Sequence, residues 1–222
     1  MLKGESDSDW RDGFLFVGNH PALDFLNTRP LLSGEEPTEL LPDFAAVLRW
    51  FRAANILGSR EASELRRQWG ESERARRALD SLHQLREKLR KEVLKYEAGG
   101  DVQKATVEEI NKLMASHPMQ TRLIVTEEGF RNEAYCDPRE PEDLLGPVAY
   151  SIAALLADLD RAKIRKCSDC VLHSTTPARK ARGGGAVCRF AETVRRWQRT
   201  RRDIAGEMSI VIAKVTRSIL RK

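Results

Sequence analysis

Apolar residues recur with helical spacing in several stretches of this chain, and residues 44–57 form the clearest of them. This stretch follows Asp43, a residue type that caps helix N-termini, and it stops before Gly58, a residue type that ends helices. Two charge-rich stretches, residues 60–70 and 72–98, continue the pattern. The second has one apolar stripe, made of Leu79, Leu82, Leu85, Leu89 and Val93. The spacing therefore predicts consecutive helices over these three stretches.

The period changes further along the chain. Residues 106–116 predict another short helix. Residues 121–126 and 130–136 alternate between apolar and polar on either side of a Glu-Glu-Gly turn, which indicates a β-hairpin. Residues 144–159 are apolar over most of a helical surface, so we expect this helix at the centre of the core. The pattern predicts an α+β fold that is mostly helical and has a small antiparallel sheet.

The N-terminal part is less regular. Residues 1–13 are polar and predict a frayed leader, and residues 14–17 predict a short strand. After a Gly-Asn-His-Pro turn, residues 22–27 fit either a second strand or a helical turn. Residues 29–42 contain three prolines and predict a loop.

Three polar residues in this part, Asp24, Asn27 and Thr28, stand among apolar neighbours. Side chains of these types often cap helices and stabilise turns by hydrogen bonds to the backbone. They also suit the polar wall of a ligand pocket. The residues alone leave both interpretations open.

Charge is distributed unevenly along the 222 residues. Residues 161–202 contain 13 Lys and Arg against two acids, a net charge of +11, whereas the rest of the chain carries −6 and the total is +5. Such a concentration of one sign favours binding to a polyanion such as nucleic acid. No apolar run approaches the roughly 20 residues that span a bilayer, and the N-terminus lacks an apolar stretch of signal-peptide length. We therefore expect a cytoplasmic protein that binds DNA and no membrane.

Three of the four cysteines lie in the basic segment and suggest a metal site. Cys167 and Cys170 have the two-residue gap of a zinc knuckle, in which two thiolates bind one cation, and Cys188 follows 18 residues later. A structural zinc site normally has four ligands, and the fourth could be His173, a water molecule, or absent. We expect zinc as the cofactor, bound weakly or substoichiometrically. Cys136 lies apart in an acidic loop and is interpreted as structural or incidental.

The chain after Cys188 predicts a long helix. Its apolar positions from Phe190 to Val215 follow a heptad-like seam, which suits packing on its own domain or pairing with a second copy in a homodimer. Arginine guanidinium groups suit phosphate oxygens. The expected DNA contacts are Arg179, Lys180, Arg182, Arg189, Arg195, Arg196, Arg199 and Arg202.

Common enzyme motifs are missing from the sequence. It has no G-x-S-x-G, no H-E-x-x-H, no P-loop and no dinucleotide-binding fingerprint. None of the four histidines forms a recognisable motif with a nucleophile. We therefore expect no enzymatic activity and assign no catalytic residue.

Several of these stretches resemble one bacterial family. The segment Leu23–Thr28 reads Leu-Asp-Phe-Leu-Asn-Thr and resembles the opening motif Leu-Asp-Phe-x-Asn-Thr of the ABATE domain. Further stretches, WFRAANILG, LREKLRKEV and LLGPVAYSIAALLADLDRAKIRKC, follow in the family's order, so the resemblance covers roughly residues 14–202. Proteins of this family combine an N-terminal ABATE domain with a C-terminal CGNR zinc finger and are regarded as stress-induced transcription regulators.

The resemblance implies two domains. Residues 14–160 would form an α+β domain that senses a small-molecule effector, with Asp24, Asn27 and Thr28 as its ligand-binding positions. Residues 161–222 would form a small treble-clef-like zinc-finger module that ends in a long helix.

The finger departs from the family pattern at two places. Arg182-Gly183 stands where the family has Trp-Cys, so one expected zinc ligand is Gly183, and Cys188-Arg189-Phe190-Ala191 replaces Cys-Gly-Asn-Arg. The function expected from the resemblance is a DNA-binding transcription regulator with an N-terminal ligand-sensing domain. The alternative is a protein-interaction or dimerisation module whose degenerate finger no longer binds DNA.

Overall fold

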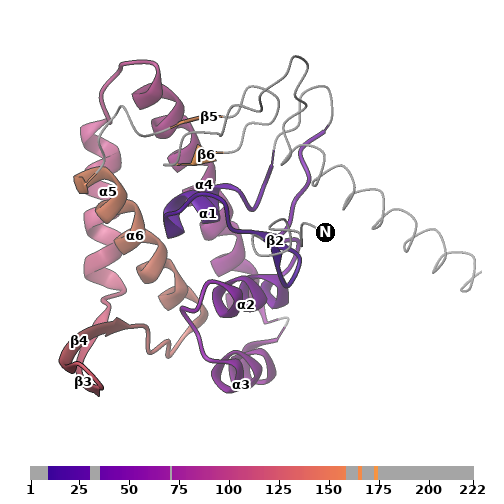
Figure 1. Ribbon diagram of the computed structural model, residues 1–222. Helices are drawn as coiled ribbons and strands as arrows, with labels where there is room; N and C mark the ends of the chain where they lie inside the picture. The colour runs from indigo at the N-terminus through magenta and orange to yellow at the C-terminus, as the bar shows by residue number, and fades with distance from the viewer. Residues whose placement is uncertain (1–9, 31–35, 71, 159–164, 167–172, 175–222) are drawn as a thin grey trace, which may run out of the picture.

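The computed structural model describes residues 10–30, 36–70, 72–158, 165–166 and 173–174, and the structural statements below concern these residues. Within them, α-helices α1 to α6 dominate, and the strands pair only in two-stranded antiparallel sheets (Figure 1). The largely helical α+β fold is therefore confirmed.

A short hairpin opens the described chain. β1 (Trp10–Arg11) pairs antiparallel with β2 (Phe14–Leu15). The connecting residues Asp12 and Gly13 have φ angles of 51° and 82°, the positive values that a two-residue hairpin turn of this hand needs and that Asp-Gly adopts readily. The prediction of a frayed leader was therefore wrong for residues 10–13, where the Asp-Gly turn signal was overlooked.

Residues 22–27 form a helix, which resolves the choice between strand and helical turn. α1 (Pro21–Leu26) has Pro21 at its first position, where the missing N–H costs nothing. Although it is only six residues long, α1 is buried from Ala22 to Leu26 and packs against both α4 and α6. It is therefore a central element of the core.

The first long helices follow the predicted order. α2 (Phe44–Ala53), α3 (Ser59–Trp69) and α4 (Glu73–Glu97) come next in the chain. Asp43 caps α2 as predicted, since its carboxylate accepts a 2.7 Å hydrogen bond from the Ala46 N–H. In the core formed by α1 and α2, the Trp50 ring meets the Phe25 ring edge-on at 5.5 Å between centroids.

The predicted end of α2 at residue 57 was wrong. The helix stops at Ala53, and Asn55 turns the chain with a φ of 59°. The Leu57 N–H then bonds back to the Phe51 carbonyl at 3.2 Å. Gly58 serves as the N-cap of α3 and does not end α2.

The second half of the domain agrees with the pattern of the sequence. It comprises α5 (Lys104–Ser116), β3 (Gln120–Thr126), β4 (Gly129–Tyr135), the 3₁₀ turn η1 (Pro141–Leu144) and α6 (Leu145–Asp158). β3 and β4 form the predicted hairpin, and α6 supplies buried residues to the core. No described helix is long and apolar enough to cross a membrane.

Two short strands follow α6. β5 (Arg165–Lys166) pairs antiparallel with β6 (His173–Ser174), and β6 lies against α1. Figure 1 shows this pair near α1 and α4, whereas the β3–β4 hairpin projects at the opposite end of the molecule. The fold thus brings the end of the described chain back to the motif Leu23–Thr28.

Candidate ligand-binding site

The start of α1 is fixed by hydrogen bonds from the turn that precedes it. The Asp24 carboxylate accepts a 2.7 Å hydrogen bond from the Gly18 N–H, and the His20 Nδ1 accepts one from the Ala22 N–H at 3.3 Å. A Cβ atom at Gly18 would come within 2.6 Å of the Leu23 Cβ, so the turn can lie this close to the helix only with glycine. Asp24 therefore holds the turn against α1.

The end of α1 carries the other two residues of the predicted ligand set. Asn27 is the C-cap residue, and its backbone N–H donates to the Leu23 carbonyl at 2.9 Å. The Thr28 hydroxyl donates to the Phe25 carbonyl at 2.6 Å. Asn27 and Thr28 are each 1% exposed, and Asp24 is 8% exposed. All three are buried, and the side chains of Asp24 and Thr28 make the cap and turn hydrogen bonds considered from the sequence, whereas the cap at Asn27 is formed by its backbone N–H.

Arg86 of α4 meets Thr28 inside the protein. Its Nη1 donates to the Thr28 hydroxyl at 2.9 Å and to the Glu39 Oε1 at 2.8 Å. Its Nη2 donates to the second oxygen of Glu39, which makes the pair bidentate. Glu39 comes from the loop before α2. The guanidinium thus joins three separate parts of the chain at a site where its own exposure is 1%.

Arg90 lies one turn further along α4 and caps the C-terminal end of α1. Its Nη2 donates to the carbonyls of Leu26 and Arg29, both at 2.9 Å. A cation suits this end of a helix because the last carbonyls are otherwise unpaired there. The Nη1 of Arg90 is buried and has no hydrogen-bond partner among the described residues. Its N–H groups could therefore donate to a further acceptor.

Charged side chains around these contacts carry a net positive charge. We call them the arginine cluster, which consists of Arg29, Glu39, Arg86, Glu87 and Arg90. It holds three guanidinium groups against two carboxylates. Burial raises the pKa of Glu87, but the neighbouring guanidinium groups outweigh burial and leave the pKa below its ordinary value. Burial and the neighbouring guanidinium groups of Arg86 and Arg29 lower the pKa of Arg90, and the Glu87 carboxylate only partly offsets them. An additional anionic group would therefore be favourable here.

Sequence reasoning missed both buried arginines. The signal that could have revealed Arg86 is its spacing, because it stands four residues after Leu82 and three before Leu89 and so falls inside the apolar stripe of α4. Arg90 follows at the next i, i+4 position, on the same side of the helix. A charged residue inside an apolar stripe predicts a buried, paired charge.

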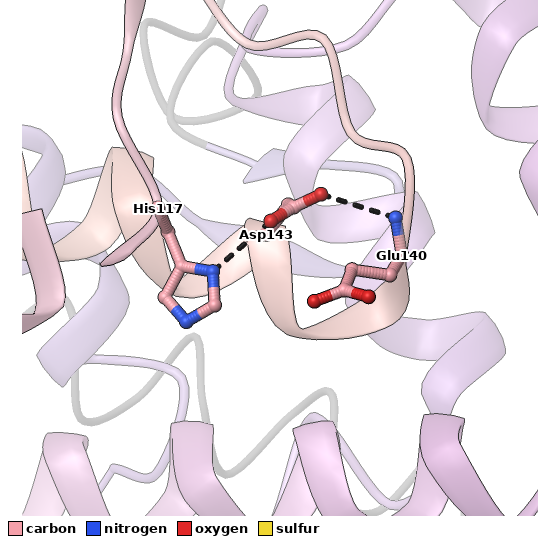
Figure 2. Close-up of side chains that lie close together, drawn as sticks. All are labelled: His117, Glu140 and Asp143. Atoms are coloured by element: carbon pink, nitrogen blue, oxygen red, sulfur yellow. Dashed lines mark hydrogen bonds and ion pairs between the residues drawn. The ribbon is translucent and has the colours of Figure 1, made fainter. Parts of the chain in front are cut away.

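A second polar cluster links α5 to α6. His117 Nδ1 lies 3.0 Å from the Asp143 Oδ1, and the Asp143 Oδ2 accepts from the Glu140 backbone N–H (Figure 2). The same oxygen accepts from the Arg139 backbone N–H. The side chain of Glu140 pairs with Arg74 of α4. Although His117, Glu140 and Asp143 have the residue types of a metal site, each is committed to a contact that fixes the loop before α6. We interpret the cluster as structural.

One cavity of about 10 Å³ lies among the side chains of α4, α5 and α6, between Leu89, Ile110 and Ile152. This volume is about that of one water molecule, and the lining is apolar. It is too small for an effector. The arginine cluster is the candidate site because it holds a buried guanidinium nitrogen that has no hydrogen-bond partner among the described residues.

The predicted zinc and DNA contacts fall largely outside the described residues. The predicted contacts that lie outside the described residues are the zinc ligands Cys167, Cys170 and Cys188 and all of the DNA contacts, Arg179, Lys180, Arg182, Arg189, Arg195, Arg196, Arg199 and Arg202. The backbone of His173 is described, in β6. Because β5 and β6 pair, the two ends of the segment that contains Cys167 and Cys170 are held together.

Comparison with known proteins gives one family. A family model named ABATE, with the description "Putative stress-induced transcription regulator", matches residues 19–159. The match spans α1 to α6 and includes the arginine cluster. No curated protein matches the chain.

Proposed function

Because the chain belongs to the ABATE family of transcription regulators, we propose that it is a DNA-binding regulator with two parts. Residues 14–160 sense a small-molecule effector, and residues 161–222 contact DNA. The charge of the sequence supports this division, since residues 161–202 carry +11 and the rest of the chain carries −6.

The observation that carries this proposal is the contact between α1 and β6. On one side, Arg90 donates to the carbonyl of Leu26, the last residue of α1, and Arg86 donates to the Thr28 hydroxyl just beyond the helix. On the other side, β6 belongs to the segment that leads into the basic region. A change in how the arginines are paired would alter the position or stability of α1, and α1 would pass this change to β6. Coupling of this kind needs packed elements that can change their arrangement together. The packing of α1 against both α4 and β6 supplies the contacts for it.

An anionic effector suits the arginine cluster best. The Nη1 of Arg90 has donors without a partner, and the cluster has one positive charge more than it has carboxylates. A carboxylate or phosphate group can accept two parallel hydrogen bonds from a guanidinium group. The effector would therefore compete with Glu39 or Glu87 for the arginines of α4.

DNA binding can be tested with two matched charge-reversal variants. Arg195→Glu/Arg196→Glu removes two expected phosphate contacts, whereas Arg66→Glu/Arg67→Glu makes the same change in charge on the exposed side of α3. We expect fluorescence anisotropy with labelled genomic fragments to show at least tenfold weaker binding for the first variant and near wild-type binding for the second. Binding should also weaken steeply with salt. Equal losses in both variants, or no salt-dependent binding at all, would exclude a specific role for the basic segment.

Effector binding can be tested by thermal shift with a panel of small carboxylates and phosphates. Arg90→Lys keeps the positive charge but loses the planar fork, and Arg60→Lys makes the same change at an exposed position of α3. We expect an anion that raises the Tm of the wild type and of Arg60→Lys but not of Arg90→Lys. If every stabilising anion acts equally on all three proteins, the arginine cluster is not its site.

Zinc would be bound by Cys167, Cys170, Cys188 and His173, and its role would be to stabilise the module. Thiolate and imidazole are the ligands that zinc prefers in such sites. The pairing of β5 with β6 supports this set, because it brings His173 next to the chain that leads into Cys167. Since one family ligand position is Gly183, we expect less than one tightly bound zinc per chain. Metal analysis of the purified protein that gave one tightly bound zinc would contradict this expectation.

A further inference from the structure

Glu39 occupies a position that is built to hold a carboxylate. Arg86 donates from Nη1 to its Oε1 at 2.8 Å and from Nη2 to its Oε2, and the Leu41 N–H donates to the same Oε1 at 2.8 Å. Arg86 is 1% exposed, and the Thr28 hydroxyl accepts a further hydrogen bond from its Nη1 at 2.9 Å. The donors around this carboxylate are therefore fixed by buried parts of the protein.

The backbone that follows Glu39 is held by contacts that do not involve the Glu39 side chain. The Leu40 N–H donates to the Thr28 carbonyl at 3.0 Å, and the side chains of Leu40 and Leu41 are buried. The His83 Nε2 lies 2.9 Å from the Leu41 carbonyl oxygen and donates to it, because a carbonyl only accepts. The Glu39 side chain, which is 29% exposed, can therefore rotate into water while its hydrogen-bond donors stay in place.

We propose that the effector is a carboxylic acid whose carboxylate replaces that of Glu39 on the guanidinium group of Arg86. This inference rests on the proposed function and names the chemical class of its effector. The exchange keeps the buried guanidinium paired, because the incoming carboxylate accepts the same two parallel hydrogen bonds. It therefore avoids the unpaired buried charge that makes breaking such a pair costly. The displaced Glu39 carboxylate turns to water, which hydrates its charge.

The shape of the position favours a carboxylate over a phosphate group. The two Nη groups of Arg86 and the Leu41 N–H all donate to two oxygens of one planar group. A phosphate group is tetrahedral and places further charged oxygens outside that plane. The His83 Nε2, 3.7 Å from the Glu39 Oε1, is already used by the Leu41 carbonyl. Charged oxygens that lose water without gaining a donor are unfavourable, so a phosphate should bind here more weakly than a carboxylate.

Arg90 lies in the same cluster as Arg86. Glu87 accepts from the Arg86 Nε at 3.4 Å and from the Arg90 Nε at 3.3 Å, so one carboxylate contacts both guanidinium groups. The buried Nη1 of Arg90 has no partner among the described residues. An effector whose carboxylate binds Arg86 can therefore place a second acceptor at Arg90, which is why Arg90→Lys should weaken its binding.

Glu39 competes with the effector because it belongs to the same chain. An attached carboxylate has a high effective concentration at Arg86, so the apparent affinity of the wild type is reduced by the small fraction of molecules in which Glu39 has left. A molecule that offers only a carboxylate should therefore bind weakly, and an effector needs further contacts to displace Glu39. Removing the Glu39 side chain should strengthen the binding of a small carboxylate at least about tenfold.

Thermal unfolding of Glu39→Ala in sodium acetate tests the proposal. About 300 mM acetate should raise its Tm by roughly 2–4 °C above that in sodium chloride of equal concentration, as expected for a Kd of about 60 mM. The wild type, with binding at least about tenfold weaker, should gain less than about 1 °C. Arg86→Met/Glu39→Ala lacks the donor group, and in the control Glu64→Ala the unpaired Arg60 is 93% exposed. Neither variant should respond to acetate more than the wild type does.

Three results would overturn the proposal. If acetate raises the Tm of Glu39→Ala no more than that of the wild type, the vacated position does not bind a free carboxylate. If Arg86→Met/Glu39→Ala responds like Glu39→Ala, acetate binds elsewhere. If sodium phosphate at equal ionic strength stabilises Glu39→Ala as strongly as acetate does, the position is a general anion site. Should Glu39→Ala not fold, Glu39→Gln decides by the same criteria, because it keeps the length of the side chain and removes its charge.

These outcomes are separate from those of the proposed function. The acetate response needs no DNA, so its absence would leave salt-dependent DNA binding and the Arg90-dependent response to anions unaffected. A chain that responds to acetate as expected but binds no DNA would retain the carboxylate position and contradict the proposed regulator.

Discussion

Removing the carboxylate of Glu39 should destabilise the protein more than removing the guanidinium of Arg86, although the two groups form one ion pair. The reason is their difference in exposure, which is 1% for the Arg86 side chain and 29% for that of Glu39. Glu39→Leu leaves a fully buried cation without its bidentate partner, and breaking a buried pair in this way costs about 3–5 kcal/mol. Arg86→Met leaves a carboxylate that water can reach, so we expect a smaller cost of about 2–3 kcal/mol.

The double variant separates the pair from the packing around it. In Arg86→Met/Glu39→Leu no charge is left without a partner, and its stability should be close to that of Arg86→Met alone. The expected coupling energy between the two positions therefore equals the cost of Glu39→Leu alone, about 3–5 kcal/mol. The hydrogen bond from Arg86 to the Thr28 hydroxyl is lost in both proteins and does not enter this difference.

Urea unfolding followed by tryptophan fluorescence measures these free energies, since Trp50 and Trp69 are buried in the domain. The control is Glu64→Leu, which breaks the surface pair with Arg60, where the side chains are 51% and 93% exposed. Exposed pairs contribute at most about 0.5 kcal/mol at this helix spacing. The reasoning is refuted if the effects of Arg86→Met and Glu39→Leu add within about 0.5 kcal/mol, or if Glu39→Leu costs no more than the control.

Three further changes have predictable outcomes. Burial raises the pKa of Asp143, but its hydrogen bonds with His117 and two backbone N–H groups hold the pKa below the usual 3.8. Its contribution to stability is therefore present at pH 7 and lost as the pH falls through the lowered pKa, so urea midpoints should show Asp143→Asn destabilising at pH 7 and nearly neutral at about pH 2. Burial, together with nearby acidic groups, raises the pKa of the Cys136 thiol to about 12, so peptide mapping after iodoacetamide treatment at about pH 8 should find Cys136 unmodified in the native protein and modified in urea. A Cβ at Gly146 would lie 2.2 Å from the His117 carbonyl oxygen, so Gly146→Ala should cost about 1–3 kcal/mol, and an unchanged Tm would contradict this packing.

Helix starts were predictable from the sequence because their signals are local. Asp43 accepts a hydrogen bond from the backbone three residues on, and Ser72 does the same at the start of α4. The prediction of where α2 ends was wrong for a related reason. Glycine is common both after a helix and before one, so Gly58 alone could not show that it starts α3.

The identity of α1 could not be decided by periodicity. A segment of six apolar and polar residues fits a strand or a helix equally well, and packing makes the choice. Because α4 and α6 both pack against α1, it is buried on more than one side and shows no simple amphipathic pattern. The polar residues Asp24 and Thr28 stood out among apolar neighbours, but their partners Gly18 and Arg86 are set by the turn and by tertiary contact.

The arrangement around α1 changes how the motif Leu23–Thr28 is interpreted. Its polar groups do not converge on one point, since Asp24 faces the turn at Gly18 and Thr28 faces Arg86 at the other end of the helix. A ligand therefore need not touch every residue of the motif in order to act through it. Arg90 donates to the last carbonyl of α1, and β6 lies against the same helix, so the proposed effector would act on α1 through this arginine. Under the proposed function, the motif would connect the arginine cluster with the segment that leads to the basic region, and the assignment of Asp24, Asn27 and Thr28 as ligand-binding residues stays a prediction.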